Sequence, residues 1–268
     1  MENISYETLE KNGFEGYLCP QDAPVKMLQF GEGNFLRAFV DRYFDMANEI
    51  TGWNGKIVMV QPISGDYGFA DGINAQADLY TVLMRGKLDG KTYDEARVVS
   101  SCESCINPYR AEDYKKVMDV AVSDDLEIIV SNTTEAGIAY DPSCKADDEP
   151  PASFPAKMAQ VLHARWCAGK PGVIVLACEL IDHNGEELLR IMKQYVAGSR
   201  SSSTGWRRIA PSAPRSSTPS SRAVSATRKR PPRSPSAWAT RIRSSPCASR
   251  SRCGVSRATS RSRNAFRS

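Results

Sequence analysis

The chain has 268 residues, of which 41% are hydrophobic and 25% are charged, and its formal net charge is +4. That value is the sum of two unlike segments. Residues 1–198 carry 18 Lys and Arg against all 31 Asp and Glu, a net charge of −13, whereas residues 199–268 carry 17 Lys and Arg and no acid. This contrast excludes a single uniform globular domain, and the longest apolar run, residues 173–178, is far short of the roughly 20 residues that cross a bilayer.

The first 198 residues alternate between strand and helix patterns. Residues 25–30 form an apolar run that ends at Gly31 and predict a buried strand. A helix is expected over 35–48, with Phe35, Phe39, Tyr43 and Met46 spaced for one face. The elements expected after it are a strand over 56–61, a hairpin of 79–85 and 92–100 around Asp89 and Gly90, helices over 112–122, 155–168 and 186–196, and strands over 126–131 and 173–177.

This alternation indicates an α/β fold, a Rossmann-like parallel sheet with helices on both faces. In such sheets, ligands bind at the carboxyl ends of the strands, where the strand order reverses. The loops after Phe30, Gln61, Ser131 and Ala177 are therefore the places where we expect a functional site.

The loop after the first strand contains a Gly-x-Gly pattern. Gly31 would allow a tight turn from strand to helix, and Gly33, without a Cβ, would let a pyrophosphate approach the amides of the following helix. The third glycine of the dinucleotide fingerprint is replaced by Leu36, so an ordinary glycine turn is the alternative. The second strand ends at Gln61, where NAD enzymes often place an acid for the adenosine ribose, and that contact stays unassigned.

The other polar motifs are less specific. Residues 131–137 either orient a cofactor or cap a turn. The pair Cys102 and Cys105 has no partner pair at zinc-site spacing, so we interpret these residues as incidental thiols and expect no metal site. His163 is expected to be a surface or packed residue, and His183 stands in a ligand-side loop without an evident nucleophile or second base, so no catalytic residue is assigned.

The last 70 residues hold 20 Ser and 16 Arg but no Leu, Tyr, Gln, Asp or Glu, a composition that favours disorder. Arg-Ser runs of this kind resemble RNA-binding segments. The genetic code offers a simpler explanation, because 63 of the 70 residues can be encoded with C or G at the middle codon base. That is the pattern of a GC-rich gene read one base forward. We expect a frameshifted tail after residue 198, with a genuine basic tail as the alternative.

Four stretches together resemble a known family, the mannitol dehydrogenases, and within it the tagaturonate reductase (altronate oxidoreductase) branch. They are residues 28–41, 131–138, 153–157 and 178–186. The resemblance implies an N-terminal Rossmann-type domain that binds NAD. The residues expected at the cofactor are Gly31, Glu32, Gly33, Asn34, Phe35, Arg37, Thr133, Thr134 and Glu135.

The resemblance also implies a reaction, D-altronate + NAD ⇌ D-tagaturonate + NADH, in hexuronate catabolism in the bacterial cytoplasm. Another polyol or sugar-acid specificity of the same family is the alternative. The expected partner is a small sugar acid, with no nucleic acid and no membrane. In this family a lysine in a helical C-terminal domain acts as general base, followed by a histidine, and residues 199–268 contain one lysine, Lys229, and no histidine. We therefore expect the chain as written to be a truncated form with little or no dehydrogenase activity.

Overall fold

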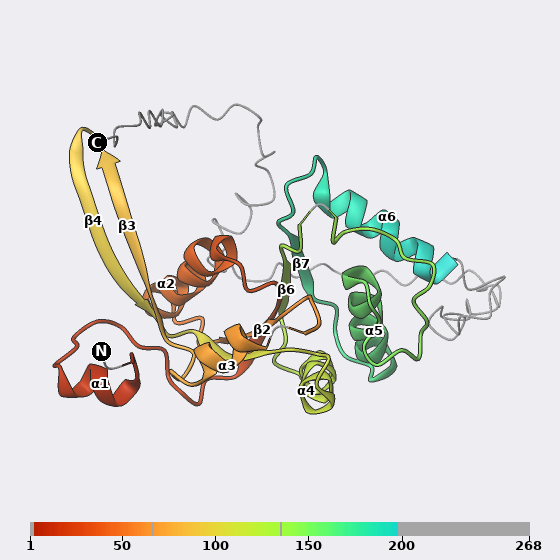
Figure 1. Cartoon of the computed structure of the whole chain (residues 1–268), viewed down its shortest axis with the longest axis horizontal. Helices are drawn as coiled ribbons and strands as arrows, with labels where there is room; N and C mark the ends of the chain where they lie inside the picture. Colours follow the sequence, from red (N-terminus) through yellow and green to blue (C-terminus); the bar gives the residue numbers. More distant parts are fainter. Residues whose placement is uncertain (1–2, 66, 135, 198–268) are drawn as a thin grey trace, which may run out of the picture. The chain divides into compact units, whose positions relative to one another are not determined.

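The centre of the protein is a five-stranded parallel sheet, seen here in a computed structural model that describes residues 3–65, 67–134 and 136–197 (Figure 1). The strand order is β5-β2-β1-β6-β7, and each neighbouring pair is parallel. The chain runs outward from β1 to one edge and then returns to β6, so the order reverses between β1 and β6. This arrangement confirms the predicted Rossmann-like sheet. The strands are β1 (Val25–Phe30), β2 (Lys56–Val60), β5 (Cys102–Ile106), β6 (Ile128–Ser131) and β7 (Ile174–Ala177).

Helices cover both faces of the sheet because alternate strand residues point to opposite sides. Leu28 and Phe30 of β1 pack with α4, α5 and α6 on one face of the sheet. Met27 of the same strand packs with η1 and α3 on the other face. Successive residues of β2 divide in the same way. The helices are α1 (Tyr6–Lys11), the π-helix η1 (Leu36–Asp41), α2 (Arg42–Thr51), α3 (Gly68–Asn74), α4 (Ala111–Ala121), α5 (Phe154–Cys167) and α6 (Asn184–Ala197).

Local sequence signals fix several of these boundaries. The Ser153 hydroxyl caps α5 by accepting a hydrogen bond from the Ala156 amide, and α2 ends at Gly52, whose φ is 66°. Strands β3 (Tyr80–Leu88) and β4 (Lys91–Val99) form a separate antiparallel hairpin. Its turn residues, Asp89 and Gly90, both have positive φ, as the predicted two-residue turn requires.

Three elements were not anticipated from the sequence. Helix α1 is short and buries no side chain, and α3 contains two glycines, so neither has a clear apolar stripe. Strand β5 carries Glu103 and Ser104 in its middle, so its sequence shows no continuous apolar run. Cys102 and Cys105 are buried in that strand, with exposed fractions of 2% and 1%.

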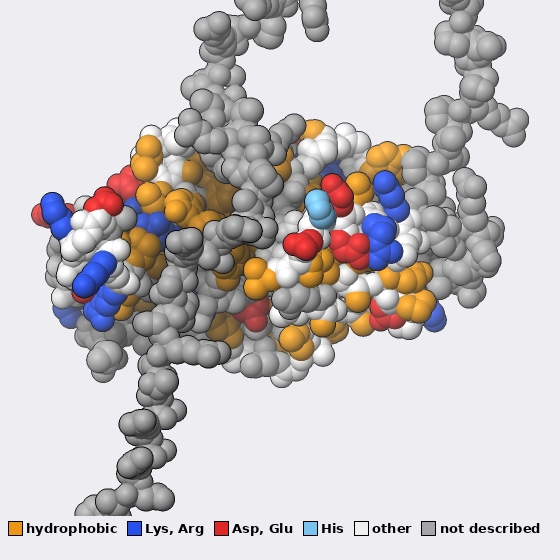
Figure 2. Space-filling view, turned by 90° about the horizontal axis from the view of Figure 1, so that it is seen from above, with side chains coloured by type: hydrophobic (Ala, Val, Ile, Leu, Met, Phe, Trp, Pro, Cys, Tyr) orange, Lys and Arg blue, Asp and Glu red, His pale blue; other side chains and the backbone are white. Residues whose placement is uncertain are grey.

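The aromatic residues expected on one helical face do share a face, but that face is turned to solvent. Phe35, Phe39 and Tyr43 are 46%, 51% and 51% exposed, and their rings pack on one another with centroids 5.4 and 5.0 Å apart. The buried face instead carries Leu36 and Val40. Figure 2 shows hydrophobic side chains reaching the surface among charged ones on the face seen there.

The Ser/Arg-rich tail expected after residue 198 lies outside the described residues. Within the described ranges, no helix is both long and apolar enough to cross a membrane.

Candidate functional site

The loops that follow β1 and β6 meet at the point where the strand order reverses. The Gly31 amide donates to Val60 O at 2.9 Å, and the Asn132 amide donates to Phe30 O at 3.0 Å. These two bonds extend the strand pairing by one residue on each side of β1. The predicted glycine loop and the predicted polar loop are therefore neighbours at the carboxyl edge, where Rossmann-like sheets bind their ligands.

Gly31 is required by both conformation and space. Its φ is 117°, which is outside the range that side-chain-bearing residues normally adopt. A Cβ at this position would lie 2.8 Å from the backbone carbonyl oxygen of Asn132 and 3.2 Å from Leu36 Cδ1. The glycine thus lets the loop after β1 pass close to the loop after β6.

Gly33 borders open space instead. A Cβ at this position would meet no atom within 4 Å, and the residue is exposed. No side chain caps the helix that begins beside it. The first amides of a helix carry partial positive charge and bind anions, so this end of the loop is a suitable site for a phosphate group.

Arg37 holds the glycine loop in shape. Its Nε donates to Glu32 O at 2.9 Å and its Nη2 donates to Asn34 Oδ1 at 2.6 Å. The guanidinium lies over the Phe69 ring, 4.9 Å from its centroid, and faces the Tyr80 ring at 5.8 Å. Arg37 therefore fixes the loop and packs it against α3 and the start of the hairpin.

Three side chains form a polar chain across the ends of β1, β2 and β5. Gln61 Nε2 donates to Glu32 Oε1 at 3.4 Å, and Gln61 Oε1 accepts from Asn107 Nδ2 at 3.4 Å. Asn107 Nδ2 also donates to Ile63 O at 3.0 Å. Gln61 and Asn107 are buried. The residue at the end of β2 is thus held in place between a glycine-loop acid and the loop after β5.

The loop after β6 is fastened to the loop after β7. Both the amide and the hydroxyl of Thr133 donate to Glu179 Oε1 at 3.3 Å, and Asn132 Nδ2 donates to Cys178 O at 2.6 Å. Glu179 is 2% exposed, and its Oε2 has no hydrogen-bond partner in the described part of the chain. Thr134 is exposed with a φ of 71°. The Gly137 amide donates to Thr134 O at 3.1 Å, so the backbone turns at this point.

A cleft of about 370 Å³ opens between the loops that follow β2 and β6. Its walls are mainly small or apolar. The lining residues are Pro62, Ile63, Thr133, Ala136, Gly137, Ala139, Asp141, Ala152, Ser153 and Phe154.

The segment after β5 supports both walls of this cleft without lining it. Asn107 binds the carbonyl of Ile63 on one wall. On the other wall, Lys157 Nζ donates to Ala152 O at 2.8 Å and to the Tyr109 hydroxyl at 3.1 Å, and that hydroxyl donates to Ala152 O at 3.4 Å. Burial lowers the pKa of Lys157 to about 8.

A buried carboxyl group stands behind the glycine loop. Asp41 Oδ2 accepts hydrogen bonds from the Tyr80 hydroxyl at 2.9 Å and from Gln29 Nε2 at 3.4 Å, while the same Gln29 nitrogen donates to Gly31 O at 3.1 Å. Burial raises the pKa of Asp41 to about 7, although the hydrogen bonds from Tyr80 and Gln29 act to lower it. Asp41 Oδ1 has no partner within the described residues, which also favours the protonated acid.

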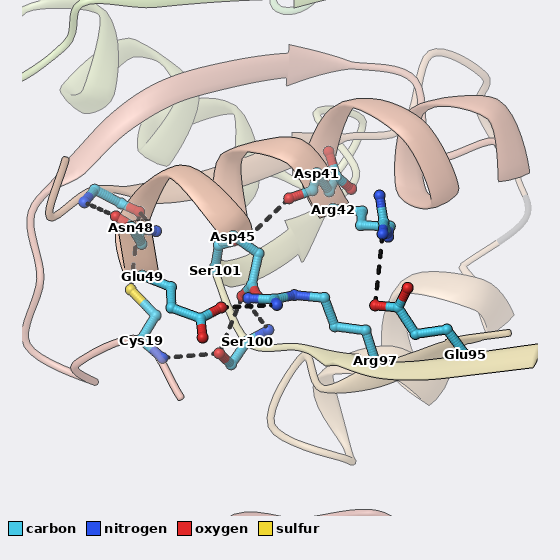
Figure 3. Close-up of polar contacts among 11 residues, drawn as sticks. Cys19, Asp41, Arg42, Asp45, Asn48, Glu49, Glu95, Arg97, Ser100 and Ser101 are labelled. Atoms are coloured by element: carbon cyan, nitrogen blue, oxygen red, sulfur yellow. Dashed lines mark hydrogen bonds and ion pairs between the residues drawn. The ribbon is translucent and has the colours of Figure 1, made fainter. Parts of the chain in front are cut away.

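A second buried acid, Asp45, anchors the base of the hairpin to α2 (Figure 3). Asp45 Oδ2 pairs with Arg97 at 2.6 Å, and its Oδ1 accepts from the amide and hydroxyl of Ser100 at 2.9 and 3.1 Å. The Cys19 amide in turn donates to the Ser100 hydroxyl at 2.8 Å. One carboxylate thus joins α2, the hairpin and the segment before β1.

The structure brings most of the predicted cofactor residues to one edge of the sheet. Gly31, Glu32, Gly33, Asn34 and Phe35 follow β1, Arg37 lies in the first turn of η1, and Thr133 and Thr134 lie in the neighbouring loop. Glu135 lies outside the described residues.

The two histidines considered in the sequence lie outside the loops after β1 and β6. His163 Nε2 lies 3.3 Å from Cys167 Sγ on α5, and His183 is exposed at the start of α6, with Nδ1 3.9 Å from Glu186. No group of His, Cys, Asp and Glu that could hold a metal ion occurs among the described residues.

Sequence reasoning missed Asn107 and Glu179. Asn107 directly follows β5 and Glu179 lies two residues beyond β7, and this position at the carboxyl ends of strands is a signal that could have found them. Asn107 was overlooked because β5 was not predicted.

A family model described as the mannitol dehydrogenase Rossmann domain matches residues 25–206. Curated relatives include the altronate oxidoreductase of Bacteroides thetaiotaomicron, 41% identical over 177 residues, and that of Pectobacterium atrosepticum, 40% identical over 196 residues. These matches cover 65% and 71% of this chain but only 36% and 38% of the relatives, so the chain spans little more than a third of their length.

Two solved structures have a similar fold. One is the mannitol 2-dehydrogenase of Pseudomonas fluorescens in a ternary complex with NAD and D-mannitol, with a TM-score of 0.58 and 21% identity. The other is a D-sorbitol dehydrogenase in substrate-free form, with a TM-score of 0.59 and 24% identity. Each comparison covers 73% of this chain, and 42% and 43% of the respective neighbour.

Proposed function

Because the chain belongs to the mannitol dehydrogenase family, we propose that residues 25–197 bind NAD along the carboxyl edge of the sheet, as part of a sugar-acid dehydrogenase. The observation that carries this proposal is the glycine loop at the reversal between β1 and β6. Its first glycine makes the close turn, and its second borders open space at the start of a helix.

The residues at this edge fit a dinucleotide. A pyrophosphate needs room beside the loop and backbone N–H groups that point at it. The open position beside Gly33 and the uncapped helix start provide both. Asn34 and Phe35 then form the rim of the phosphate site, and Arg37 keeps their loop in place.

The adenosine half of the cofactor fits the cleft between the loops after β2 and β6. Pro62, Ile63 and Phe154 offer apolar contacts to a flat ring, and a cleft of about 370 Å³ is within the size range of cofactor pockets. We place the nicotinamide half on the β7 side of the reversal, near Thr134.

The finer proposal concerns the reaction, D-altronate + NAD ⇌ D-tagaturonate + NADH, within hexuronate catabolism in the cytoplasm. It rests on the identity of about 40% with altronate oxidoreductases. NAD, when bound, accepts the hydride from the carbinol carbon of the substrate. The role of the described residues is to bind and orient the cofactor.

We further propose that residues 1–198 form the cofactor domain and that residues 199–268 are a frameshifted segment in place of a helical catalytic domain. A positioned general base contributes roughly 10²- to 10⁴-fold to such reactions. The chain as written is therefore expected to turn altronate over very slowly. Resequencing tests the frameshift, because the alternative frame after codon 198 should encode a helix-rich sequence with a lysine and a histidine.

The binding proposal is tested by titrating the full chain with NADH and following the cofactor fluorescence. Gly33→Leu places a side chain in the phosphate space and should weaken binding at least about tenfold. Gly172→Leu is the matched control, because Gly172 also borders open space but lies before β7, at the opposite edge. Circular dichroism should show both variants folded.

Two results would contradict these proposals. Absence of NADH binding by the unmodified chain, or equal binding by Gly33→Leu, would overturn the assignment of the cofactor site. Ordinary turnover of altronate with NAD by the same chain would refute the expected loss of activity.

A further inference from the structure

The end of β2 carries an amide where an NAD-binding sheet commonly has an acid. Gln61 occupies this position, is 4% exposed, and both ends of its amide are engaged, by Glu32 and by Asn107. In NAD-binding sheets the acid at this place accepts a hydrogen bond from the 2′-hydroxyl of the adenosine ribose. Gln61 therefore supplies no negative charge there.

Glu32 brings a carboxylate to the same place from the glycine loop. Its Oε1 accepts the hydrogen bond from Gln61 at 3.4 Å. The same Gln61 side chain accepts a hydrogen bond from Asn107, which directly follows β5. The Glu32 carboxylate thus lies at the end of β2, beside the residue that precedes Pro62 and Ile63 of the cleft we assign to adenosine.

One oxygen of this carboxylate has no intramolecular partner. Within the described ranges, Glu32 Oε2 accepts no hydrogen bond, and the residue is only partly buried. Gln61 holds Oε1 and is itself held by Asn107, so the carboxylate is oriented by two buried amides. A ligand hydroxyl can reach Oε2 without displacing this arrangement.

We propose that Glu32 accepts a hydrogen bond from the adenosine ribose 2′-hydroxyl and makes the site selective for NAD over NADP. This inference rests on the proposed cofactor site. A 2′-phosphate would place about two negative charges beside the carboxylate, and like charges in contact at a partly desolvated site repel strongly. The expected preference for NADH over NADPH is therefore about 100-fold or more.

The nearby cations do not provide a phosphate site. NADP-binding sheets use an arginine near the end of β2 for the 2′-phosphate. Here Arg37 donates to Glu32 O and Asn34 Oδ1. Arg110 forms a two-pronged pair with Asp71 at 2.8 and 2.9 Å. Both guanidinium groups are already engaged by protein acceptors, so the balance of charge favours an unmodified ribose.

The test compares NADH and NADPH binding to the full chain by cofactor fluorescence. Glu32→Gln keeps an acceptor oxygen for the ribose hydroxyl but removes the charge. NADH affinity should stay within about threefold, whereas NADPH should bind at least about tenfold more tightly. Glu112→Gln removes an exposed charge on α4 as the general control. Asp66→Asn tests the first acid that follows β2 in the sequence, which lies outside the described residues.

The inference would be supported if the ratio of the NADH affinity to the NADPH affinity decreased in Glu32→Gln and in neither other variant. An unchanged affinity ratio in Glu32→Gln, or an equal decrease of this ratio in Asp66→Asn, would overturn the assignment to Glu32. Either result would leave the proposed cofactor site intact. If the unmodified chain binds neither cofactor, the proposed function fails and this inference fails with it.

Discussion

Replacing Gly31 by alanine tests whether the glycine loop depends on both a special backbone conformation and a close approach. Holding a non-glycine residue at a φ of 117° costs about 1–3 kcal/mol. The new methyl would also lie 2.8 Å from the Asn132 carbonyl oxygen. Because this oxygen belongs to the backbone, it cannot move by a simple rotamer change, and such overpacking typically costs about 1–3 kcal/mol.

The expected loss of unfolding free energy for Gly31→Ala is therefore about 2–6 kcal/mol. Urea denaturation followed by circular dichroism measures it, and with an m-value of about 2 kcal/mol/M the midpoint should fall by roughly 1–3 M. NADH binding should weaken as well, since the loops after β1 and β6 would separate.

Gly33→Ala serves as the matched control, because the same methyl at position 33 meets no atom within 4 Å. Its urea midpoint should lie close to that of the unmodified chain. The reasoning would be refuted if Gly31→Ala left the midpoint unchanged, or if both variants lost equal stability.

Three further predictions concern buried charges. The raised pKa of Asp41 means that its native carboxyl stays protonated to about pH 7, so its contribution, up to about 4 kcal/mol, is lost as pH rises from about 4 to 7. Urea titrations should show that Asp41→Asn removes this decline. Arg97→Ala leaves the fully buried Asp45 carboxylate without its cation and should cost about 3–5 kcal/mol, measured by the same titration at pH 7. Lys157 has a lowered native pKa of about 8, so its contribution to stability increases from pH 8 to 10, and Lys157→Met should flatten that part of the profile.

The sheet could be predicted well from the sequence because most of its strands are uninterrupted apolar runs. The segments around β1, β2, β6 and β7 are short, mainly apolar and bounded by Gly, Pro or polar residues, and such patterns leave few alternatives. Strand β5 escaped detection because Glu103 and Ser104 interrupt its apolar residues. Strand β7, at the other edge of the sheet, is an uninterrupted apolar run and was predicted.

The glycine loop could be located from its position after the first strand, but its partners could not. Glu32 reaches Gln61 only because β1 and β2 are neighbours in the sheet, and Asn107 joins them only because β5 is next in order. Strand order is a long-range property that the local sequence does not encode. The outward-facing aromatic residues Phe35 and Phe39 also show that a shared helical face need not be the buried one.

The segment after β5 connects the two walls of the cleft through hydrogen bonds from its side chains. Asn107 and Tyr109, two residues apart, each hold one wall, and neither lines the cleft. Inserting or deleting a residue between them would change the separation of the walls while every lining side chain stayed the same. The size of ligand that the cleft admits therefore depends on the spacing of two side chains that do not line it.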